Sequence, residues 1–398
     1  MSLYEDERGQ NVFHFNAAPF AIVQSFTSHN KQGVLRGLHR SPYAKYITCL
    51  SGSIFDVVIQ PDGQSYKSYS LKEGDSLLIP PNHAHGFYCL KPSSLTYCLA
   101  GVFDAALDLN IHWNDPHLAI PWPLLPGEPI VSAKDTANAF LKPIDTVVLG
   151  GTGYLGGELL RHVPNSIALV HRLEDPISLR KALTFLRPKH LICAAGISGK
   201  PTIDWCETHA EATLFANVTG QLNVMHVCRE LGIHLTVIGS GAVFGDGVFT
   251  EEDKPNLTTK VYSKLRILLE QMLPYYAEVL YLRVLYPLSG TGHDKCFLTK
   301  MKTRLASLHD TRVSVTVIPS LFPKIQTLLD AKLGGIYNFV NQGQVSLTRI
   351  LDIFGVGGYN VVPFDGSRGS CELVTGKLSR HVTVQNVETA LCAIAAST

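Results

Sequence analysis

The stretch that most constrains the fold is a glycine-rich turn in mid-chain, Gly150-Gly-Thr-Gly-Tyr-Leu-Gly156. It follows a short run of β-branched and leucine residues, Thr146–Leu149, and opens an apolar-periodic segment that extends to His162. Glycines spaced three apart suit a loop that turns tightly, approaches a pyrophosphate closely and aims helix N-terminal amides at it. Because the pattern lies between a predicted strand and a predicted helix, it indicates a dinucleotide site more than a structural turn.

The late position of this loop divides the chain. A dinucleotide-binding domain begins with such a strand and loop, so the roughly 140 residues in front need a fold of their own. A chain of 398 residues is also longer than one core usually supports. We therefore expect two domains, residues 1–140 and 144–398, with the connection within Ala133–Pro143.

Short alternating or β-branched runs fill the first domain. Turn residues such as Ser51-Gly52 separate them at intervals typical of a β-sandwich or barrel. Since no long helical period intervenes, the sequence predicts an all-β jelly roll. The expected strands are Ala21–Phe26, Tyr46–Leu50, Ile54–Ile59, Ser65–Leu71, Ser76–Ile79, Gly86–Leu90 and Leu95–Ala100.

Beyond the glycine loop, strand-like and helix-like segments alternate. That rhythm predicts right-handed βαβ units, a parallel sheet and an α/β Rossmann fold, which we expect to end in a small C-terminal substrate-binding part. The expected strands are Thr146–Leu149, Ile167–Val170, Leu191–Ala194, Leu235–Ile238 and Val279–Leu285, and the expected helices are Leu155–His162, Ser178–Leu186, Ala210–Leu231 and Tyr262–Leu273.

The charge balance and the cysteines narrow the class of partner and compartment. The formal net charge is +1, which offers no long-range attraction to nucleic acid or an acidic membrane, so we expect a small-molecule partner. Nine cysteines without CxxC spacing read as reduced thiols of a cytoplasmic protein. The N-terminus lacks a signal-peptide core, and no apolar run reaches membrane-spanning length.

Two histidine-bearing stretches mark the first domain, Gly33-Val-Leu-Arg-Gly-Leu-His39 and Ile79-Pro-Pro-Asn-His-Ala-His-Gly-Phe87. Together with Trp113-Asn-Asp-Pro116 and Ser132-Ala-Lys-Asp135, in this order, they resemble the 3,5-epimerases of the dTDP-rhamnose pathway. The resemblance covers about Asn11 to Asp135. It implies a cupin-like jelly roll that acts on a sugar nucleotide.

Inverting a carbon beside a ketone needs a base, a group that stabilises the enolate, and an acid on the opposite face. The resemblance implies that His39 is the base and that Asp135 orients it. It places Lys45 near the developing oxyanion and places Arg36 and His85 in the substrate pocket.

Phe103 is a departure from this family. The resemblance implies that it takes the place of the family's tyrosine acid, and phenylalanine cannot donate a proton. The domain could then invert one carbon, use water as the acid, or only bind the sugar nucleotide. His83 and His85 have chelating spacing, but no glutamate follows and the first motif adds only one histidine, so we expect no metal.

The second domain carries a further set of motifs. These are Ala194-Ala-Gly-Ile-Ser-Gly-Lys-Pro201, Asp204-Trp-Cys-Glu207, Ala216-Asn-Val-Thr-Gly220 and Tyr262-Ser-Lys264. They resemble extended short-chain dehydrogenases, and within them the 4-keto sugar reductases of rhamnose synthesis. The likeness is greatest to the plant-type UDP-4-keto-6-deoxyglucose 3,5-epimerase/4-reductases.

In those reductases a serine or threonine and a tyrosine bind the ketone oxygen, and a lysine four residues after the tyrosine holds the ribose. The resemblance gives the first two roles to Ser240 and Tyr262, while Arg266 stands where the lysine would be. This exchange is not conservative, because guanidinium is larger and planar. Ala242 replaces the cysteine with which the plant-type enzymes epimerise, whereas Lys300 matches their paired lysine.

The cofactor is expected to lie over the glycine loop. NAD-binding domains have an Asp or Glu at the end of the second strand that hydrogen-bonds the ribose 2′-OH. This chain has Val170-His-Arg172 there instead. Arg172 could pair with a 2′-phosphate, so NADPH is favoured over NADH. The expected cofactor-binding residues are Gly150, Gly153, Tyr154, Leu155, Gly156, Arg172, Ala194, Ala195, Gly196, Asn217, Tyr262 and Arg266.

These observations predict a bifunctional enzyme that epimerises a nucleotide-linked 4-keto-6-deoxyhexose at C3 and C5 and then reduces the C4 ketone to give a nucleotide-rhamnose. One alternative is a catalytically degenerate NADP-binding scaffold or regulatory protein, since Phe103 and Arg266 both depart from the expected residues. Another is a single-carbon epimerase/reductase that makes a different deoxysugar. By analogy with the family's jelly rolls we expect a homodimer; the sequence does not distinguish UDP, dTDP and GDP.

Overall fold

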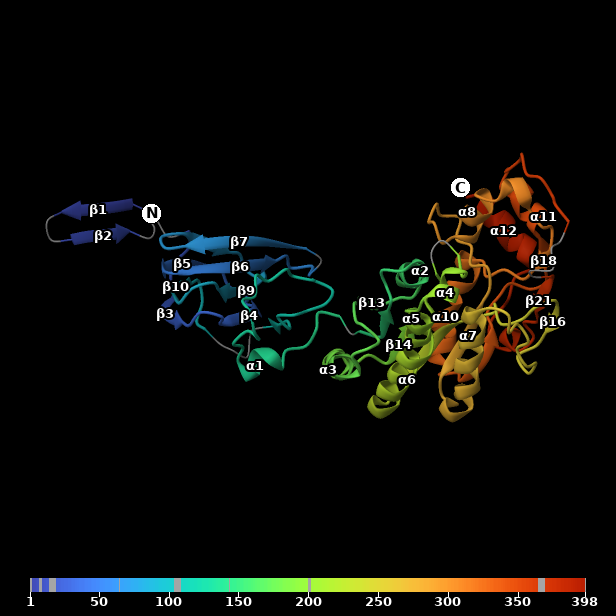
Figure 1. Ribbon diagram of the computed structural model, residues 1–398. Coiled ribbons are helices and arrows are strands. Elements are labelled where there is room, and N and C mark those ends of the chain that lie inside the picture. Colours follow the sequence, from blue (N-terminus) through green and yellow to red (C-terminus); the bar gives the residue numbers. More distant parts are fainter. Residues whose placement is uncertain are drawn as a thin grey trace. The chain divides into compact units, whose positions relative to one another are not determined.

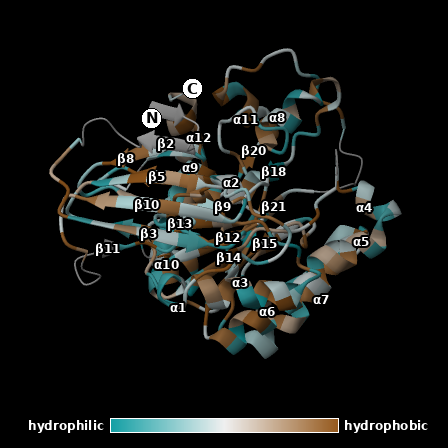
Figure 2. Cartoon of the chain, turned by 90° about the vertical axis from the view of Figure 1, so that its left-hand side faces the viewer, coloured by the Kyte–Doolittle hydropathy of each residue, from teal (hydrophilic) through white to brown (hydrophobic). Residues whose placement is uncertain are grey.

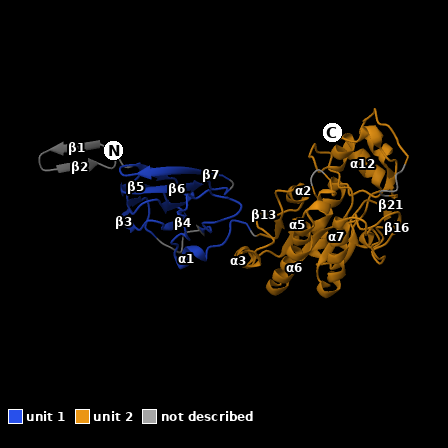
Figure 3. Cartoon of the chain, in the orientation of Figure 1, with its two compact units in different colours: residues 1–143 blue, residues 144–398 orange. Residues whose placement is uncertain are grey.

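The computed structural model describes residues 2–6, 9–13, 19–63, 65–103, 109–142, 144–199, 202–363 and 369–397. The chain divides into two compact units, residues 1–143 and 144–398 (Figures 1 and 3). Each unit has apolar clusters of its own. Among the described residues, no helix combines the length and the apolar character that crossing a bilayer requires.

Two antiparallel sheets form the first unit, which confirms the predicted jelly roll. One has the order β3-β10-β5-β8 and the other β11-β4-β9-β6-β7, and a hairpin of β1 and β2 precedes them. The strands are β1 (Ser2–Asp6), β2 (Gly9–Phe13), β3 (Gln24–Asn30), β4 (Leu35–Arg40), β5 (Lys45–Ser51), β6 (Ser53–Ile59), β7 (Tyr66–Lys72), β8 (Ser76–Ile79), β9 (Ala84–Cys89), β10 (Ser93–Leu99) and β11 (Leu109–Asn110).

All six residues of β9 are buried, because both faces of its sheet are covered. On the inner face, Phe87 and Cys89 pack with Ile47 of the opposite sheet. On the outer face, Tyr88 packs with Trp122, which belongs to the segment that follows β11. The inner face is therefore the interior of the jelly roll, where side chains of both sheets meet.

The segment Ala133–Pro143, expected to connect the domains, belongs to the first unit over most of its length. It contains the short helix α1 (Ala133–Thr136), and the amide of Leu141 donates to a carboxylate oxygen of Asp115 at 2.6 Å. The Leu141 side chain packs against the outer apolar cluster of the jelly roll. The sequence placed the connection between the domains in this segment, whereas these contacts attach most of it to the jelly roll; Pro143 lies outside the described residues.

The second unit contains a six-stranded parallel sheet with the order β13-β12-β14-β15-β17-β19, which confirms the predicted α/β fold. Its strands are β12 (Thr146–Leu149), β13 (Ser166–Leu169), β14 (His190–Cys193), β15 (His234–Ser240), β17 (Leu280–Val284) and β19 (Gly335–Asn338). From β12 the chain runs outward to β13 and then returns past β12 to β14. The carboxyl ends of β12 and β14 are thus a topological switch point, where open α/β sheets bind ligands.

Helices cover the parallel sheet. They include α2 (Tyr154–His162), α3 (Pro176–Leu186), α5 (Ala210–Leu214), α6 (Gly220–Leu231), α7 (Val261–Met272) and α10 (Ile325–Asp330). The short helix α4 (Trp205–Thr208) contacts α5 and α7, and α12 (Val387–Ala395) contacts α11 (Leu347–Ile353). In Figure 2, α6 and α7 carry both hydrophobic and hydrophilic residues, as expected for helices that pack one face on a sheet. The single helix predicted over 210–231 is interrupted by a π-helical turn, η1 (Phe215–Thr219), whose Asn217 is engaged by another segment.

A smaller part completes the second unit, as predicted. Its four-stranded sheet has the order β16-β21-β18-β20. The strands are β16 (Gly247–Phe249), β18 (Arg312–Val313), β20 (Val345–Ser346) and β21 (Cys371–Leu373). Three helices lie between β17 and β21 in the sequence: α8 (Phe297–Lys302), α9 (Ile318–Leu321) and α11 (Leu347–Ile353).

Candidate active sites

A β-bulge in β4 sets up the site of the first unit. Arg36 and His39 are three residues apart, so a regular strand would point them to opposite faces. The pairing of β4 with β9 shifts between them: Arg36 pairs with Phe87, and His39 pairs with His85. Since Phe87 and His85 are two residues apart on β9, the bulge turns Arg36 and His39 toward the same inner face.

His39 and Asp135 form the pair expected from the sequence. Nε2 of His39 donates to Oδ1 of Asp135 at 2.8 Å, and the Gly37 amide donates to Oδ2 at 3.4 Å. Burial alone would raise the pKa of Asp135, but the hydrogen bond and the charge of His39 outweigh burial and lower it. Asp135 is held in α1, which Ser132 caps by accepting the Asp135 amide, so a buried carboxylate orients the imidazole.

A second His–Asp pair lies deeper. Nδ1 of His85 is 3.4 Å from Oδ2 of Asp56, and both side chains are buried. Burial raises the pKa of Asp56 well above its usual range and lowers that of His85, which Lys45 lowers further. Burial therefore disfavours the charged form of both groups. Sequence reasoning missed Asp56, although a carboxylate inside the apolar run Ile54–Ile59 is a signal that could have revealed it.

Of the two aromatic residues Tyr97 and Phe103, Tyr97 is the buried one. The Tyr97 ring on β10 is 7% exposed and stacks on Phe26 with centroids 4.7 Å apart. Burial raises the pKa of its phenol, which also interacts electrostatically with Asp56 and Arg36. Phe103 is 50% exposed. A phenol is thus present inside the jelly roll even though position 103 lacks one.

The glycine loop of the second unit has the geometry that its spacing predicts. Gly150 has φ +81°, and a Cβ there would lie 2.7 Å from the Ala195 amide nitrogen. A Cβ at Gly156 would lie 2.0 Å from the carbonyl oxygen of Gly150, so Gly156 lets α2 pack close under the turn. Gly153 is the N-cap of α2. These features match a tight turn, a close helix approach and an open helix N-terminus for a pyrophosphate.

A cavity of about 810 Å³ opens over this loop. Its lining joins the glycine turn, the ends of β14 and β15, the start of α7 and helix α8. Eleven expected site residues are among its lining residues: Gly150, Gly153, Tyr154, Leu155, Ala194, Ala195, Gly196, Ser240, Tyr262, Arg266 and Lys300.

Tyr262 and Arg266 lie one turn apart on α7 and share a face. Arg266 is buried, and its Cζ is 5.5 Å from the centre of the Tyr262 ring. Its Nε and Nη1 have no hydrogen-bond partner within the described part of the chain. Unpaired buried donors on a cavity wall fit a ligand rich in hydroxyl oxygens, such as a dinucleotide ribose. Together with the glycine loop, they fit an NAD(P) cofactor.

Three expected cofactor residues are not among the lining residues of the cavity: Gly156, which packs under the glycine turn, Asn217 and Arg172. Both ends of the Asn217 amide bind Ile197: Nδ2 donates to its carbonyl at 2.8 Å, and Oδ1 accepts its amide at 3.0 Å. Asn217 therefore holds the wall near Gly196 in place. Arg172 is exposed beyond the end of β13, and its contact with a 2′-phosphate stays a prediction.

Three cations of the cavity lining gather around α8: Lys295, Lys300 and Arg304. Burial lowers the pKa of Lys300, and the charges of Lys295 and Arg304 lower it further. None of the three forms an ion pair with a described carboxylate. Sequence reasoning singled out Lys300 alone, because only the fold brings the other two to the same cavity. Three cations on one cavity wall, without an ion pair to a described carboxylate, are suited to an anionic ligand.

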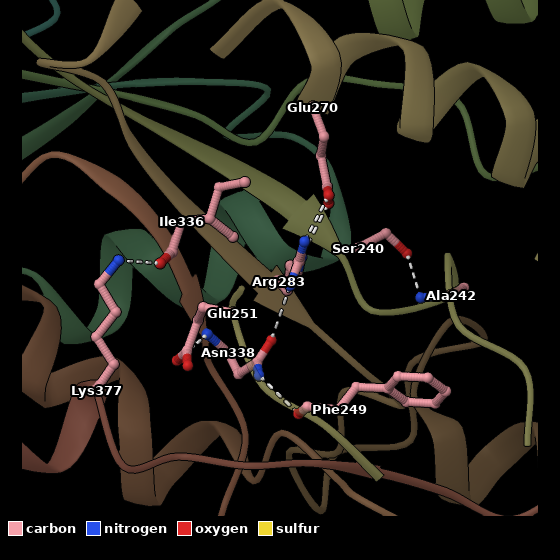
Figure 4. Close-up of polar contacts among 9 residues, drawn as sticks. All are labelled: Ser240, Ala242, Phe249, Glu251, Glu270, Arg283, Ile336, Asn338 and Lys377. Atoms are coloured by element: carbon pink, nitrogen blue, oxygen red, sulfur yellow. Dashed lines mark hydrogen bonds and ion pairs between the residues drawn. The ribbon is translucent and has the colours of Figure 1, made fainter. Parts of the chain in front are cut away.

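Behind the cavity, a buried polar network fixes α7 to the sheet (Figure 4). Arg283 of β17 donates to both carboxylate oxygens of Glu270 on α7, at 3.0 and 2.7 Å. Arg283 also donates to Asn338 of β19 at 3.4 Å, and Asn338 donates to the Phe249 carbonyl at 3.3 Å. Because breaking a buried pair on one side is costly, the network anchors the helix that carries Tyr262.

Ser240 ends β15 at the cavity. Its Oγ accepts the amide of Ala242 at 3.1 Å, as Figure 4 shows. This contact fixes the hydroxyl and leaves its proton for another acceptor. Within the described ranges, no cluster of three or more His, Cys, Asp or Glu side chains is arranged to hold a metal.

The fold and these two sites define an enzyme class, an epimerase-type jelly roll joined to an NAD(P)-dependent reductase-type Rossmann domain. Residues 1–143 match the dTDP-4-dehydrorhamnose 3,5-epimerase family, and residues 146–286 match the NAD dependent epimerase/dehydratase family. The chain is 34% identical over 223 residues to the bifunctional dTDP-4-dehydrorhamnose 3,5-epimerase/dTDP-4-dehydrorhamnose reductase of Arabidopsis thaliana, covering 52% of this chain and 73% of the relative. The chain belongs to this family of epimerase/reductases.

Longer relatives and solved structures extend the comparison. The trifunctional UDP-glucose 4,6-dehydratase/UDP-4-keto-6-deoxy-D-glucose 3,5-epimerase/UDP-4-keto-L-rhamnose-reductase RHM1 of the same plant is 35% identical over 223 residues, 52% of this chain, but the chain spans only 33% of its length. The L780 UDP-rhamnose synthase of Acanthamoeba polyphaga mimivirus superposes with TM-score 0.61 at 21% identity, over 65% of this chain and 100% of that one. A dTDP-4-dehydrorhamnose reductase of Bacillus anthracis, in complex with NADP, gives TM-score 0.56 at 18% identity, over 64% and 99%. At these identities the structures show the fold alone.

Proposed function

We propose that the chain converts a nucleotide-linked 4-keto-6-deoxyglucose to a nucleotide-rhamnose in two steps. The first unit epimerises C3 and C5, and the second reduces the C4 ketone with NADPH. The observation that carries the proposal is the presence of both sets of groups on one chain: the His39–Asp135 pair, and Tyr262 with Arg266 beside a glycine loop. The Arabidopsis relatives, whose names include both activities, support it.

In the first step, His39 removes the proton beside the ketone. Its Nε2 hydrogen is held by Asp135, which leaves Nδ1 as the base and stabilises the imidazolium that forms. Lys45, buried in the same interior, stabilises the enolate oxygen. Tyr97 donates a proton to the opposite face, a role that the phenyl ring of Phe103 cannot fill.

In the second step, the hydroxyls of Ser240 and Tyr262 hold the ketone oxygen. Bound NADPH supplies the hydride. Ser240 has its proton available because its Oγ already accepts the Ala242 amide. Tyr262 gives its proton to the oxygen as charge develops, and the Arg266 guanidinium stabilises the phenolate left behind.

The cations around α8 bind the diphosphate of the substrate in this proposal. Lys300 then acts as an anion contact, because Ala242 offers it no partner for proton transfer. Arg172 and the NADP in the Bacillus anthracis structure support NADPH, with NADH as the alternative. Relatives named for UDP and for dTDP substrates leave both nucleotides as candidates. A cytoplasmic location and a homodimer remain predictions.

Purified protein incubated with UDP- or dTDP-4-keto-6-deoxyglucose and NADPH tests the proposal. We expect the absorbance of the reduced nicotinamide to fall and NMR to identify the rhamnose epimer as product. NADPH binding without turnover or proton exchange on either substrate would contradict it and would favour the scaffold alternative.

A further inference from the structure

The N-terminus of α7 sets the position of the Tyr262 hydroxyl, because Tyr262 is the second residue of that helix. The first amides of a helix lack intrahelical partners and favour a negative charge. The N-cap residue of α7 is Lys260, which provides no side-chain hydrogen bond, and the first turn contains no acidic residue. The sequence of α7 therefore provides no cap for the helix that carries the tyrosine.

The missing acceptors come from a separate segment, residues 202–208, which includes α4. Oε1 of Glu207 accepts the amide of Val261 at 2.9 Å. Nζ of Lys260 donates to Oδ1 of Asp204 at 2.8 Å, and Thr202 donates to the other Asp204 oxygen at 2.9 Å. Two carboxylates thus reach the start of α7, where one caps the helix and the other offsets the Lys260 charge.

Local contacts stabilise the segment that provides these carboxylates, although α4 has only four residues. The rings of Trp205 and His209 stack with centroids 3.8 Å apart, and Nδ1 of His209 donates to the Trp205 carbonyl at 2.9 Å. Cys206 of the same helix is fully buried. Asp204 and Lys260 line the cavity, so the contact between α4 and α7 borders the reaction site.

We propose that α4 acts as a clamp on α7 and that Glu207 is a positioning residue for ketone reduction. Glu207 replaces the absent N-cap and so holds Tyr262 at the ketone, without touching substrate or cofactor itself. This inference rests on the proposed reduction in the second unit. It assigns a function to the Asp204-Trp-Cys-Glu207 motif that recognition of the family alone leaves unexplained.

The test compares Glu207→Ala with Glu207→Gln, which keeps the Oε1 acceptor. We expect kcat for ketone reduction to fall on the order of tenfold or more in Glu207→Ala, since small misplacements of a catalytic group are costly. The KM for NADPH should stay unchanged, because the glycine loop is untouched, and Glu207→Gln should keep most of the rate. Glu211→Ala is the matched control, because Glu211 is an exposed glutamate of α5.

A rescue variant separates capping from other roles. Lys260→Ser would supply an N-cap hydroxyl that accepts an amide of the next residues in the first turn, Tyr262 or Ser263, so combining it with Glu207→Ala should recover part of the lost kcat. A Glu207→Ala enzyme with wild-type kcat would overturn the proposal. So would a Glu207→Gln variant as slow as Glu207→Ala, with no recovery in the double variant.

Amide hydrogen exchange tests the clamp independently of turnover. The first turn of α7 should exchange faster in Glu207→Ala than in wild type or Glu211→Ala. Unchanged exchange there would overturn the clamp even in an active enzyme. Faster exchange in a protein that reduces no 4-keto sugar would sustain the clamp and reject the proposed function instead.

Discussion

At the scale of single residues, the identity of the proton donor in the first unit can be decided by exchanging two aromatic residues. We expect Tyr97→Phe to slow solvent-proton exchange beside the ketone by about 10²-fold or more, because its phenol is the buried one. Phe103→Tyr should leave the rate within about twofold, since that ring is half-exposed. Deuterium incorporation followed by NMR measures both. A gain in rate from Phe103→Tyr, with no loss from Tyr97→Phe, would contradict Tyr97 as the proton donor and would indicate that the acid belongs at position 103.

Arg266 allows a second test at this scale. Arg266→Met removes the charge and the two unpaired buried donors, so reduction should slow by about 10²-fold and NADPH should bind more weakly. Arg266→Lys keeps the charge and should retain more of the activity. Fluorescence titration of NADPH and single-turnover reduction give the two readouts. Wild-type values for both in Arg266→Met would show that the guanidinium has no part in the site.

At the scale of elements, the effect of a glycine substitution near the turn between β12 and α2 should depend on which glycine is replaced. Gly156→Ala should cost about 1–3 kcal/mol of stability and much of the NADPH affinity, because its Cβ would lie 2.0 Å from the Gly150 carbonyl oxygen. Gly157→Ala is the matched control: its Cβ would meet nothing closer than 3.7 Å, and alanine favours the helix by up to about 1 kcal/mol. Thermal unfolding with and without NADPH compares them. Equal stability of the two variants would contradict the close approach of α2 to the turn.

Two adjacent strands carry a pair of histidines whose protonation should make stability depend on pH. His190 of β14 and His234 of β15 are register partners with Nδ1 atoms 3.3 Å apart. His234 donates through Nε2 to the Leu333 carbonyl at 2.9 Å, so its Nδ1 accepts from His190. Burial lowers the pKa of both rings, and the charge of His234 lowers that of His190 further. The folded unit is therefore less able to bind these protons than the unfolded chain.

The sign of the effect follows from this difference. Above the unfolded pKa of about 6.5 both states are neutral, so stability is constant; as pH falls below it, the unfolded state takes up more protons and stability is lost. We expect a loss on the order of 1 kcal/mol between pH 7 and 5.5 in urea unfolding of the second unit, reduced in His190→Gln. His226→Gln is the control, since His226 is exposed. The same pH slope in His190→Gln as in wild type would contradict the assignment.

The sequence predicts elements better than it predicts what the elements bring together. Alternating runs placed the jelly-roll strands, and the βα rhythm placed the parallel sheet, because both depend on local periodicity. The bulge between Arg36 and His39 and the π turn at Asn217 were not foreseen, since each depends on a partner distant in sequence. Tyr97 was missed for the same reason: a tyrosine in a strand becomes a site residue only when its neighbours are known.

At the scale of the whole molecule, the chain carries two units with separate cores and separate sites. In the proposed function, Ala242 leaves the second unit without a residue for epimerisation, whereas the first unit carries the proposed proton-transfer groups His39 and Tyr97. We therefore expect the two steps to be separable by single substitutions, with epimerisation dependent on His39 and reduction on Tyr262.

The most direct test is deuterium incorporation in D₂O with a 4-keto-6-deoxyglucose nucleotide and NADPH, using wild type, His39→Ala and Tyr262→Phe. Wild type should oxidise NADPH and give a rhamnose product labelled at C3 and C5. His39→Ala should give no label, and Tyr262→Phe should label the keto sugar without oxidising NADPH. Undiminished labelling in His39→Ala, together with its loss in Tyr262→Phe, would place both steps in the second unit and contradict the division of labour between the two.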